Sequence, residues 1–191
     1  NRSQVFGYYD HNMLVMSERI SDHLPKTEKY IPKQRLWYIR AKEVIISSGS
    51  IERPLVFGNN DTPGVMLSSA AKEYLKIYGV LVGKKPLVFT NNDSGYETAI
   101  EFKKNGVDPI VLDTRKDPNS EIIKEAKDLN INIKSSYVVV AAKGYKKVNS
   151  ADIAKISDDK KNISNIENIK CDCICVSGFW TPTIHLASQS G

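Results

Sequence analysis

The stretch from Pro86 to Arg115 constrains the fold more than any other part of the chain. Leu87–Thr90 is a short apolar run typical of a buried strand, and a polar, glycine-containing turn follows it. Apolar residues then recur at helical spacing until Asn105-Gly106, a typical helix end. Val107–Leu112 predicts a second buried strand, and Asp113 follows it at the spacing of a ribose-binding acid. This order predicts a βαβ unit and an α/β, Rossmann-like fold.

The turn of this unit lacks most of a dinucleotide-binding loop. In a G-x-G-x-x-G loop the first glycine makes the turn, the second lets backbone approach the pyrophosphate, and the third lets helix and strand pack. These positions are Thr90, Asn92 and Gly95, so only the packing glycine is present. Asp93 would also place a negative charge at the helix N-terminus, where a pyrophosphate would otherwise lie. We expect residues 92–94 to cap the helix and the unit to hold no dinucleotide.

Composition narrows the class of protein. The 191 residues carry a net charge of +5, but lysines and arginines are dispersed among acidic residues, which indicates a solvated surface rather than a nucleic-acid site. No apolar run has the length of a membrane span, and no signal peptide is evident at the start of the sequence. We therefore expect a cytoplasmic protein that binds neither nucleic acid nor membrane.

Three cysteines alternate along the chain at Cys171, Cys173 and Cys175. On one strand they would share a face, where they converge poorly on a metal ion and cannot easily form disulfides with one another. We expect reduced, metal-free, buried side chains, as is usual in a reducing cytosol.

Hydrophobic patterns outside the central unit predict strands before it and a mixture of helices and strands around it. The predicted early strands are Gln4–Tyr9, Leu14–Ser17, Arg35–Ile39 and the buried run Val44–Ile46. Predicted helices are Val65–Tyr78 and Asn119–Leu129, and predicted later strands are Ile131–Ile133, Tyr137–Ala142, Lys146–Val148 and Ile169–Val176.

Two buried runs that end in Ser-Gly flank the central unit, in AKEVIISSGS before it and CDCICVSGFW after it. This arrangement predicts a Rossmann-like three-layer domain inserted between strands of an incomplete first dinucleotide-binding domain. The expected boundaries are 1–50 for the strand-rich part of the first domain, 51–150 for the inserted domain with its linker and helix, and 151–191 for the return to the first domain.

Long strings along the chain carry a family resemblance. They are distributed over nearly the whole chain and read FGYYDHN, ERISDHLP, RLWYIRAKEVIISSG, ERPLVFGNNDTPGVMLSSA, VFTNNDSGYETA and VSGFWTPTIHLASQSG. In them the chain resembles the α subunit of heterotetrameric sarcosine oxidase, within the two-dinucleotide-domain flavoprotein superfamily. The α subunits of that family are much longer, so the resemblance implies an internal segment of the N-terminal, NAD-binding half.

The resemblance implies an oxidoreductase that demethylates sarcosine oxidatively to glycine, with tetrahydrofolate and oxygen. NAD would bind in the α subunit, whereas FAD and FMN would lie elsewhere in a complex with β, γ and δ subunits. No catalytic residue would lie in this segment. Its pyrophosphate-binding loop would precede Asn1, so we expect the isolated chain to be inactive.

Carried over by position, the resemblance also implies a set of cofactor-binding residues. Ser48, Gly49 and Ser50 match the superfamily's A-T-G turn, which either approaches the dinucleotide or only packs tightly. Arg53 can pair with a phosphate, or with Glu52 or a loop carbonyl. The return-strand turn is matched by Gly178, Trp180 and Pro182.

Two other interpretations remain open. The chain can be part of the α subunit of a related amine or opine dehydrogenase. It can also be a non-catalytic assembly module whose exposed tyrosine and tryptophan side chains contact a partner subunit. The string NNDTPGVM favours sarcosine oxidase, by resemblance alone.

Overall fold

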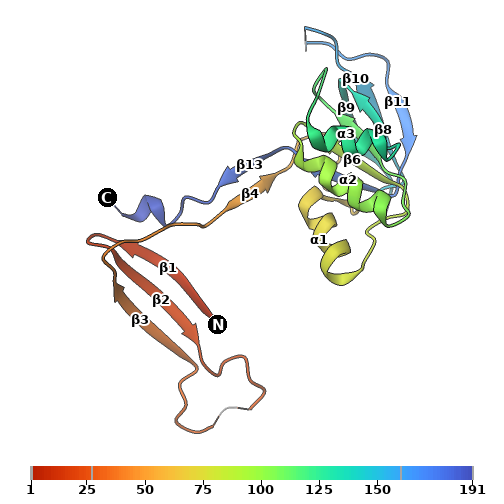
Figure 1. Ribbon diagram of the computed structural model, residues 1–191. Coiled ribbons are helices and arrows are strands. Elements are labelled where there is room, and N and C mark those ends of the chain that lie inside the picture. Colours follow the sequence, from red (N-terminus) through yellow and green to blue (C-terminus); the bar gives the residue numbers. More distant parts are fainter. Residues whose placement is uncertain (1, 27, 160, 191) are drawn as a thin grey trace. The chain divides into compact units, whose positions relative to one another are not determined.

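A computed structural model of the chain describes residues 2–26, 28–159 and 161–190 and divides them into two compact units. One unit holds the described residues up to Ile51 and from Pro182 on, and the other is Glu52–Thr181. Two short strands, β4 (Ser50–Arg53) and β13 (Phe179–Pro182), pair where the chain passes between the units (Figure 1).

The first unit is built on a three-stranded antiparallel sheet in the order β1-β2-β3. Its strands are β1 (Ser3–Tyr9), β2 (Met13–Arg19) and β3 (Gln34–Arg40), which confirms the three alternating strands predicted here. His11 and Asn12 adopt positive φ angles of 59° and 55° in the tight turn between β1 and β2. The unit also contains a short 3-10 helix, η1 (Ala187–Gln189).

The prediction of a buried strand at Val44–Ile46 is wrong. These residues lie outside the strands, and the Ile45 side chain is 92% exposed. The apolar run indicated burial, but within the described residues no neighbouring strand pairs with it.

The second unit has three layers, as Figure 1 shows. A five-stranded parallel sheet in the order β5-β12-β6-β7-β8 forms the middle layer. Its strands are β5 (Val65–Leu67), β12 (Cys173–Ser177), β6 (Pro86–Thr90), β7 (Ile110–Asp113) and β8 (Asn132–Ser135). One face packs against α1 (Ser68–Tyr78), α2 (Ser94–Lys104) and α3 (Glu121–Asp128). The other packs against an antiparallel sheet of β9 (Tyr137–Lys143), β10 (Ser150–Lys155) and β11 (Glu167–Lys170).

This architecture confirms the predicted α/β, Rossmann-like class. The central strand–helix–strand prediction corresponds to β6, α2 and β7, and β6 is buried along its whole length. Separate apolar clusters fill the two sides of the parallel sheet, with Tyr96 and Phe102 on the helical side and Phe89 and Ile153 on the other.

Several element boundaries differ from the predicted ones. Helix α1 starts at Ser68 rather than Val65, because Val65–Leu67 pairs in parallel with β12. Residues 146–148 form no strand. Instead, the Val148 amide donates to the carbonyl oxygen of Pro63 at 2.8 Å.

The predicted strand Ile169–Val176 is two strands, β11 and β12, separated at residues 171 and 172. The Asp172 carboxylate accepts the backbone amides of Lys84 (2.7 Å) and Lys85 (2.8 Å), which fixes this break beside the start of β6.

The return to the first unit also lies later than expected. It occurs at Pro182 instead of residue 151, because β10, β11 and β12 all belong to the sheets of the second unit. The entry boundary at residues 51 and 52 is close to the predicted one. Among the described residues, no helix is long and apolar enough to cross a membrane.

Candidate functional site

The turn at Ser48–Ser50 presents exposed backbone in the first unit. Gly49 has a φ of 71°, a left-handed conformation that favours glycine, and a side chain there would point into open space. The Ser48 hydroxyl donates to the carbonyl oxygen of Thr183, whose amide donates to the Gly49 carbonyl at 2.9 Å. The turn is therefore held from Thr183, next to Pro182, while its outer side stays accessible.

An apolar pocket of about 270 Å³ lies beside this turn, within the same unit. Ser47 and Ser48 line it together with Tyr8, Leu14 and Ile46. Pockets for complete small molecules usually exceed about 300 Å³. The pocket is therefore large enough for one part of a dinucleotide only.

Gly178 and Arg53 lie in the second unit, where backbone packing explains the glycine. The Gly178 amide donates to the Arg53 carbonyl oxygen at 2.8 Å, and a Cβ at Gly178 would lie 2.6 Å from that oxygen. The exposed Arg53 side chain donates from Nε to the Thr181 hydroxyl at 3.0 Å rather than to Glu52.

Trp180 lies two residues after Gly178, in β13, and its side chain is 43% exposed. Its indole Nε1 donates to the Ser94 hydroxyl at 3.0 Å. The predicted cofactor-binding residues thus fall into two sets: Ser48, Gly49, Ser50 and Pro182 in the first unit, and Arg53, Gly178 and Trp180 in the second.

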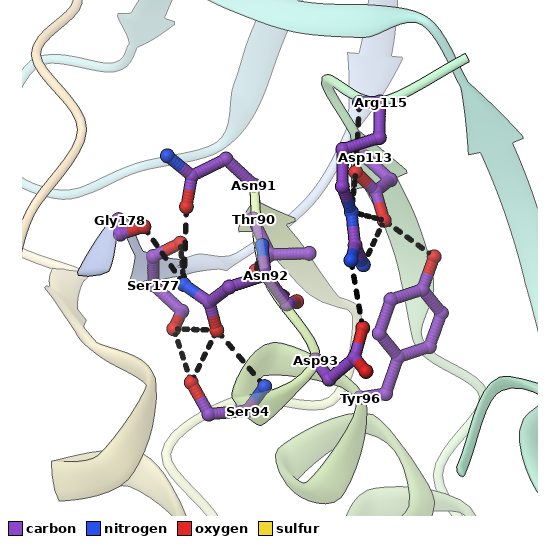
Figure 2. Close-up of polar contacts among 10 residues, drawn as sticks. All are labelled: Thr90, Asn91, Asn92, Asp93, Ser94, Tyr96, Asp113, Arg115, Ser177 and Gly178. Atoms are coloured by element: carbon purple, nitrogen blue, oxygen red, sulfur yellow. Dashed lines mark hydrogen bonds and ion pairs between the residues drawn. The ribbon is translucent and has the colours of Figure 1, made fainter. Parts of the chain in front are cut away.

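The turn between β6 and α2 is closed by its own side chains (Figure 2). The Thr90 hydroxyl donates to the Asn92 carbonyl oxygen at 2.8 Å, and the Asn92 side-chain oxygen accepts the Ser94 amide at 2.9 Å. A Cβ at Gly95 would lie 2.6 Å from the Thr90 Cβ, which confirms its role as the packing glycine. The capping interpretation holds for Asn92, whereas Asp93 makes no side-chain capping bond.

Asp113, the residue with ribose-binding spacing, is fully buried and engaged by its neighbours. It accepts a hydrogen bond from the Tyr96 hydroxyl at 2.8 Å and forms an ion pair with Arg115 Nη2 at 2.8 Å (Figure 2). Arg115 also pairs with Asp93, at 2.8 Å from Nη1. The Asp113 carboxylate therefore supports the local structure and is not exposed to a ribose.

This network shifts the pKa of two of its members. The hydrogen bond to Asp113 is the main reason that the pKa of Arg115 is raised, so the guanidinium of Arg115 stays charged. Burial, with Asp113 beside it, raises the pKa of Tyr96 and keeps the phenol protonated. Both effects favour a permanent link between α2 and the end of β7.

Glu52 is a structural residue that sequence reasoning missed. Its carboxylate, 4% exposed, accepts the Ser69 amide at 2.8 Å and the Ser69 hydroxyl at 2.6 Å. It thus caps α1 from β4, where the N-cap residue Leu67 has no suitable side chain. The separation in sequence hides this contact, and the only signal was a helix start without a capping side chain.

The cysteines do not share one face, which corrects the prediction. Cys173 and Cys175 pack on the helical side of the sheet, and Cys171 packs on the opposite side because the strand is broken at Asp172. All three are buried free thiols. Burial raises the pKa of Cys171 to about 12, and a hydrogen bond with Cys173 is the main cause of the raised pKa of Cys175.

Comparison with known proteins relates the chain to one enzyme subunit. It is 35% identical over 191 residues to a protein of Rhizobium meliloti (strain 1021) named sarcosine oxidase subunit alpha, and the match covers all of this chain. This chain is a relative of the sarcosine oxidase α subunits. A sarcosine oxidase subunit alpha of Corynebacterium sp. (strain U-96) is 33% identical over 189 residues. The chain spans only about a fifth of these α subunits, 18% and 20% respectively. No model of a known protein family matches it.

Solved structures support the same fold. Thioredoxin reductase of Lactococcus lactis matches 97% of this chain with a TM-score of 0.65 and 19% identity. The match covers 55% of the reductase. L-proline dehydrogenase from P. horikoshii matches 99% of the chain with a TM-score of 0.57, at 20% identity and over 29% of its own length. At these identities the likeness concerns the fold alone.

Proposed function

We propose that this chain contributes part of an NAD-binding region to the α subunit of a sarcosine oxidase. The observation that carries the proposal is the relation to proteins of that name along the whole chain. The complete enzyme would oxidise sarcosine to glycine, with tetrahydrofolate accepting the one-carbon unit and oxygen as oxidant. FAD and FMN would lie outside this segment, the partners would be β, γ and δ subunits, and the compartment would be the cytoplasm.

The residues of the first unit suit part of such a site. At Gly49 the backbone is left-handed and unobstructed, so a dinucleotide can approach the turn at Ser48–Ser50 directly. The adjacent apolar pocket has room for one ring of the cofactor. Of the other proposed residues, Pro182 also lies in this unit, whereas Arg53, Gly178 and Trp180 lie in the second unit. There the exposed Arg53 side chain would supply a positive charge for a phosphate.

NAD titration calorimetry on a protein of the relatives' full length that carries this segment tests the proposal. Gly49→Ala should weaken NAD binding by about tenfold or more, a loss of about 1.4 kcal/mol. Gly79→Ala is the matched control, because Gly79 has a φ of 64° and equally open surroundings at the end of α1. Equal affinities for NAD in the two variants would contradict the assignment of the Ser48–Ser50 turn.

A related amine or opine dehydrogenase is the second candidate, and the fold shared with L-proline dehydrogenase across 99% of the chain is compatible with it. The two candidates differ in substrate and in electron acceptor. Sarcosine and L-proline, each assayed for peroxide release and for reduction of an artificial dye, would separate them. Turnover of L-proline without turnover of sarcosine would replace the first proposal by the second.

A further inference from the structure

The β6–α2 turn has contacts that its capping role does not explain. The Asn92 side-chain amide donates to the carbonyl oxygens of Gly178 (2.8 Å) and Ser177 (3.3 Å), which are more than 80 residues away in sequence. The Ser94 hydroxyl accepts the indole N–H of Trp180 at 3.0 Å and lies 3.0 Å from the Ser177 hydroxyl. The side chains of Asn92 and Ser94 thus contact three residues of the segment Ser177–Trp180, which joins β12 to β13: Ser177, Gly178 and Trp180.

In this turn, protein groups occupy the backbone amides that a phosphate-binding loop would offer to its ligand. In such a loop, amides at the helix N-terminus point to the ligand. Here the Ser94 amide is satisfied by the Asn92 side chain and the Tyr96 amide by the Asp93 carbonyl at 3.0 Å. The same Asn92 side chain then turns its donor group towards Ser177 and Gly178 (Figure 2). The asparagine at the position of the second glycine therefore binds other protein groups instead of leaving the loop open to a ligand. We call the contacts of Asn92 and Ser94 with Ser177, Gly178 and Trp180 the clamp.

We propose that Asn92 and Ser94 are positioning residues that hold in place the Ser177–Trp180 segment, where β12 passes into β13. Ser177 is fully buried and Gly178 packs on the Arg53 carbonyl, so the start of the segment is rigid. Trp180 is 43% exposed, and within the described residues its ring edge is fixed by the bond to Ser94. The clamp thus presents one rigid indole surface to solvent.

A rigid, exposed indole is suited to stacking on a flat ring, because the entropy cost of ordering it has already been met. The ring would belong to the dinucleotide of the proposed function, and this step alone rests on that function. Asn92 and Ser94 would then act on the cofactor only through Trp180.

The test uses the 191-residue chain with Trp37→Phe, which leaves Trp180 as the single tryptophan. In this background Ser94→Ala should lower the fluorescence anisotropy of Trp180 and raise its acrylamide quenching constant about twofold, because the indole loses the bond that fixes it. Ser94→Thr keeps a hydroxyl and should restore the original values. Asn92→Asp, which removes the donor group but keeps the size, should likewise lower the anisotropy and raise the quenching constant.

Asn119→Ala is the control, since Asn119 is an exposed asparagine before α3 and belongs to neither of the two segments. Urea unfolding of each variant shows whether it is folded when its fluorescence is read. A folded Ser94→Ala variant with unchanged anisotropy and quenching would overturn the proposal, and so would Ser94→Thr behaving like Ser94→Ala.

A second arm separates this proposal from the proposed function. In the full-length protein, Ser94→Ala should weaken NAD binding about tenfold, whereas Ser94→Thr should not. If the unaltered full-length protein binds no NAD, the proposed function fails while the fluorescence result still decides on the clamp. If NAD binds and Ser94→Ala leaves the affinity unchanged, the stacking step is wrong.

Discussion

The Asp113 carboxylate binds neighbouring side chains and is therefore not accessible to a ligand. The position of Asp113 at the end of β7 suits a ribose contact, but Tyr96 and Arg115 bind its carboxylate and it is completely buried. A buried charge is tolerated when it is paired and hydrogen-bonded, and becomes costly when a partner is removed. Tyr96 and Arg115 are therefore expected to be important for stability.

Tyr96→Phe should lower the free energy of unfolding by about 2 kcal/mol, because a hydrogen bond to a buried carboxylate is lost while the ring volume is kept. Urea denaturation at neutral pH measures the change. Tyr145→Phe is the control, since Tyr145 is 95% exposed, and it should change stability by less than about 0.5 kcal/mol. Similar small changes in both variants would mean that Arg115 alone satisfies Asp113.

The buried thiol of Cys171 should make stability fall at alkaline pH. Its pKa is about 12 in the folded protein, against an ordinary value of 9.0. Between these values the unfolded thiol loses its proton and the folded one keeps it. The stabilisation is complete below pH 9 and is lost as pH rises towards 12, by up to about 1.4 kcal/mol per pH unit.

Cys171→Ala should therefore flatten this decline. Urea unfolding midpoints of the unaltered chain and of Cys171→Ala would be measured with reducing agent from about pH 8 to 11. The difference between the two midpoints should be constant near pH 8 and shrink above about pH 9. Parallel curves throughout would show that Cys171 ionises alike in the folded and unfolded states. The remaining slope would come from groups such as Tyr96 and Cys175, whose pKa values are also raised.

At the scale of elements, helix α1 depends on a cap that comes from another element. Leu67 at its N-cap offers no hydrogen-bonding side chain, and Glu52 of β4 accepts the Ser69 amide instead. A carboxylate there also compensates the positive end of the helix dipole. The start of α1 is thereby tied to β4.

Glu52→Ala should cost about 1–2 kcal/mol of stability, the usual effect of removing a helix cap. Glu73→Ala, which removes an exposed carboxylate from the same helix, is the control and should be nearly neutral. Thermal and urea unfolding measure both. A Glu52→Ala variant as stable as Glu73→Ala would show that solvent caps the helix equally well.

Local patterns predicted the elements whose stabilising contacts are local. The β6–α2–β7 unit and strands β1 to β3 follow from periodicity and turn residues. Contacts between residues distant in sequence determine the element boundaries that the patterns did not predict. Val65–Leu67 pairs with β12 instead of joining α1, and Asp172 divides the predicted strand Ile169–Val176 by binding amides before β6.

The candidate site shows the same division. Gly49 and Gly95 were predictable because each matches a position where a motif requires glycine. The cap from Glu52 and the contacts of Asn92 and Ser94 with Gly178 and Trp180 were not, because these partners lie 17 to 86 residues away and one sequence carries no sign of such pairing.

For the whole molecule, we expect that the 191-residue chain neither oxidises sarcosine nor binds NAD tightly. No G-x-G-x-x-G loop occurs in its sequence, and much of the affinity for a pyrophosphate comes from such a loop. The missing contacts, charge-assisted bonds of about 1.5–3 kcal/mol each, should weaken binding by orders of magnitude.

Calorimetry with NAD and a peroxide assay with sarcosine test the two parts of this expectation separately. A micromolar dissociation constant would show that the segment holds a complete nucleotide site. Peroxide formed from sarcosine by this chain alone would contradict the expected division of roles among subunits. The full-length protein of the calorimetric test serves as the positive control.

The second unit begins and ends on neighbouring strands. The Arg53 carbonyl accepts the Gly178 amide at 2.8 Å, and the Arg53 side chain contacts Thr181. A unit whose ends adjoin can be exchanged between hosts without stretching either of them. A gene fragment for residues 52–181 should therefore be transplantable into another protein, at a surface position where two consecutive residues of the new host can be joined to its two ends.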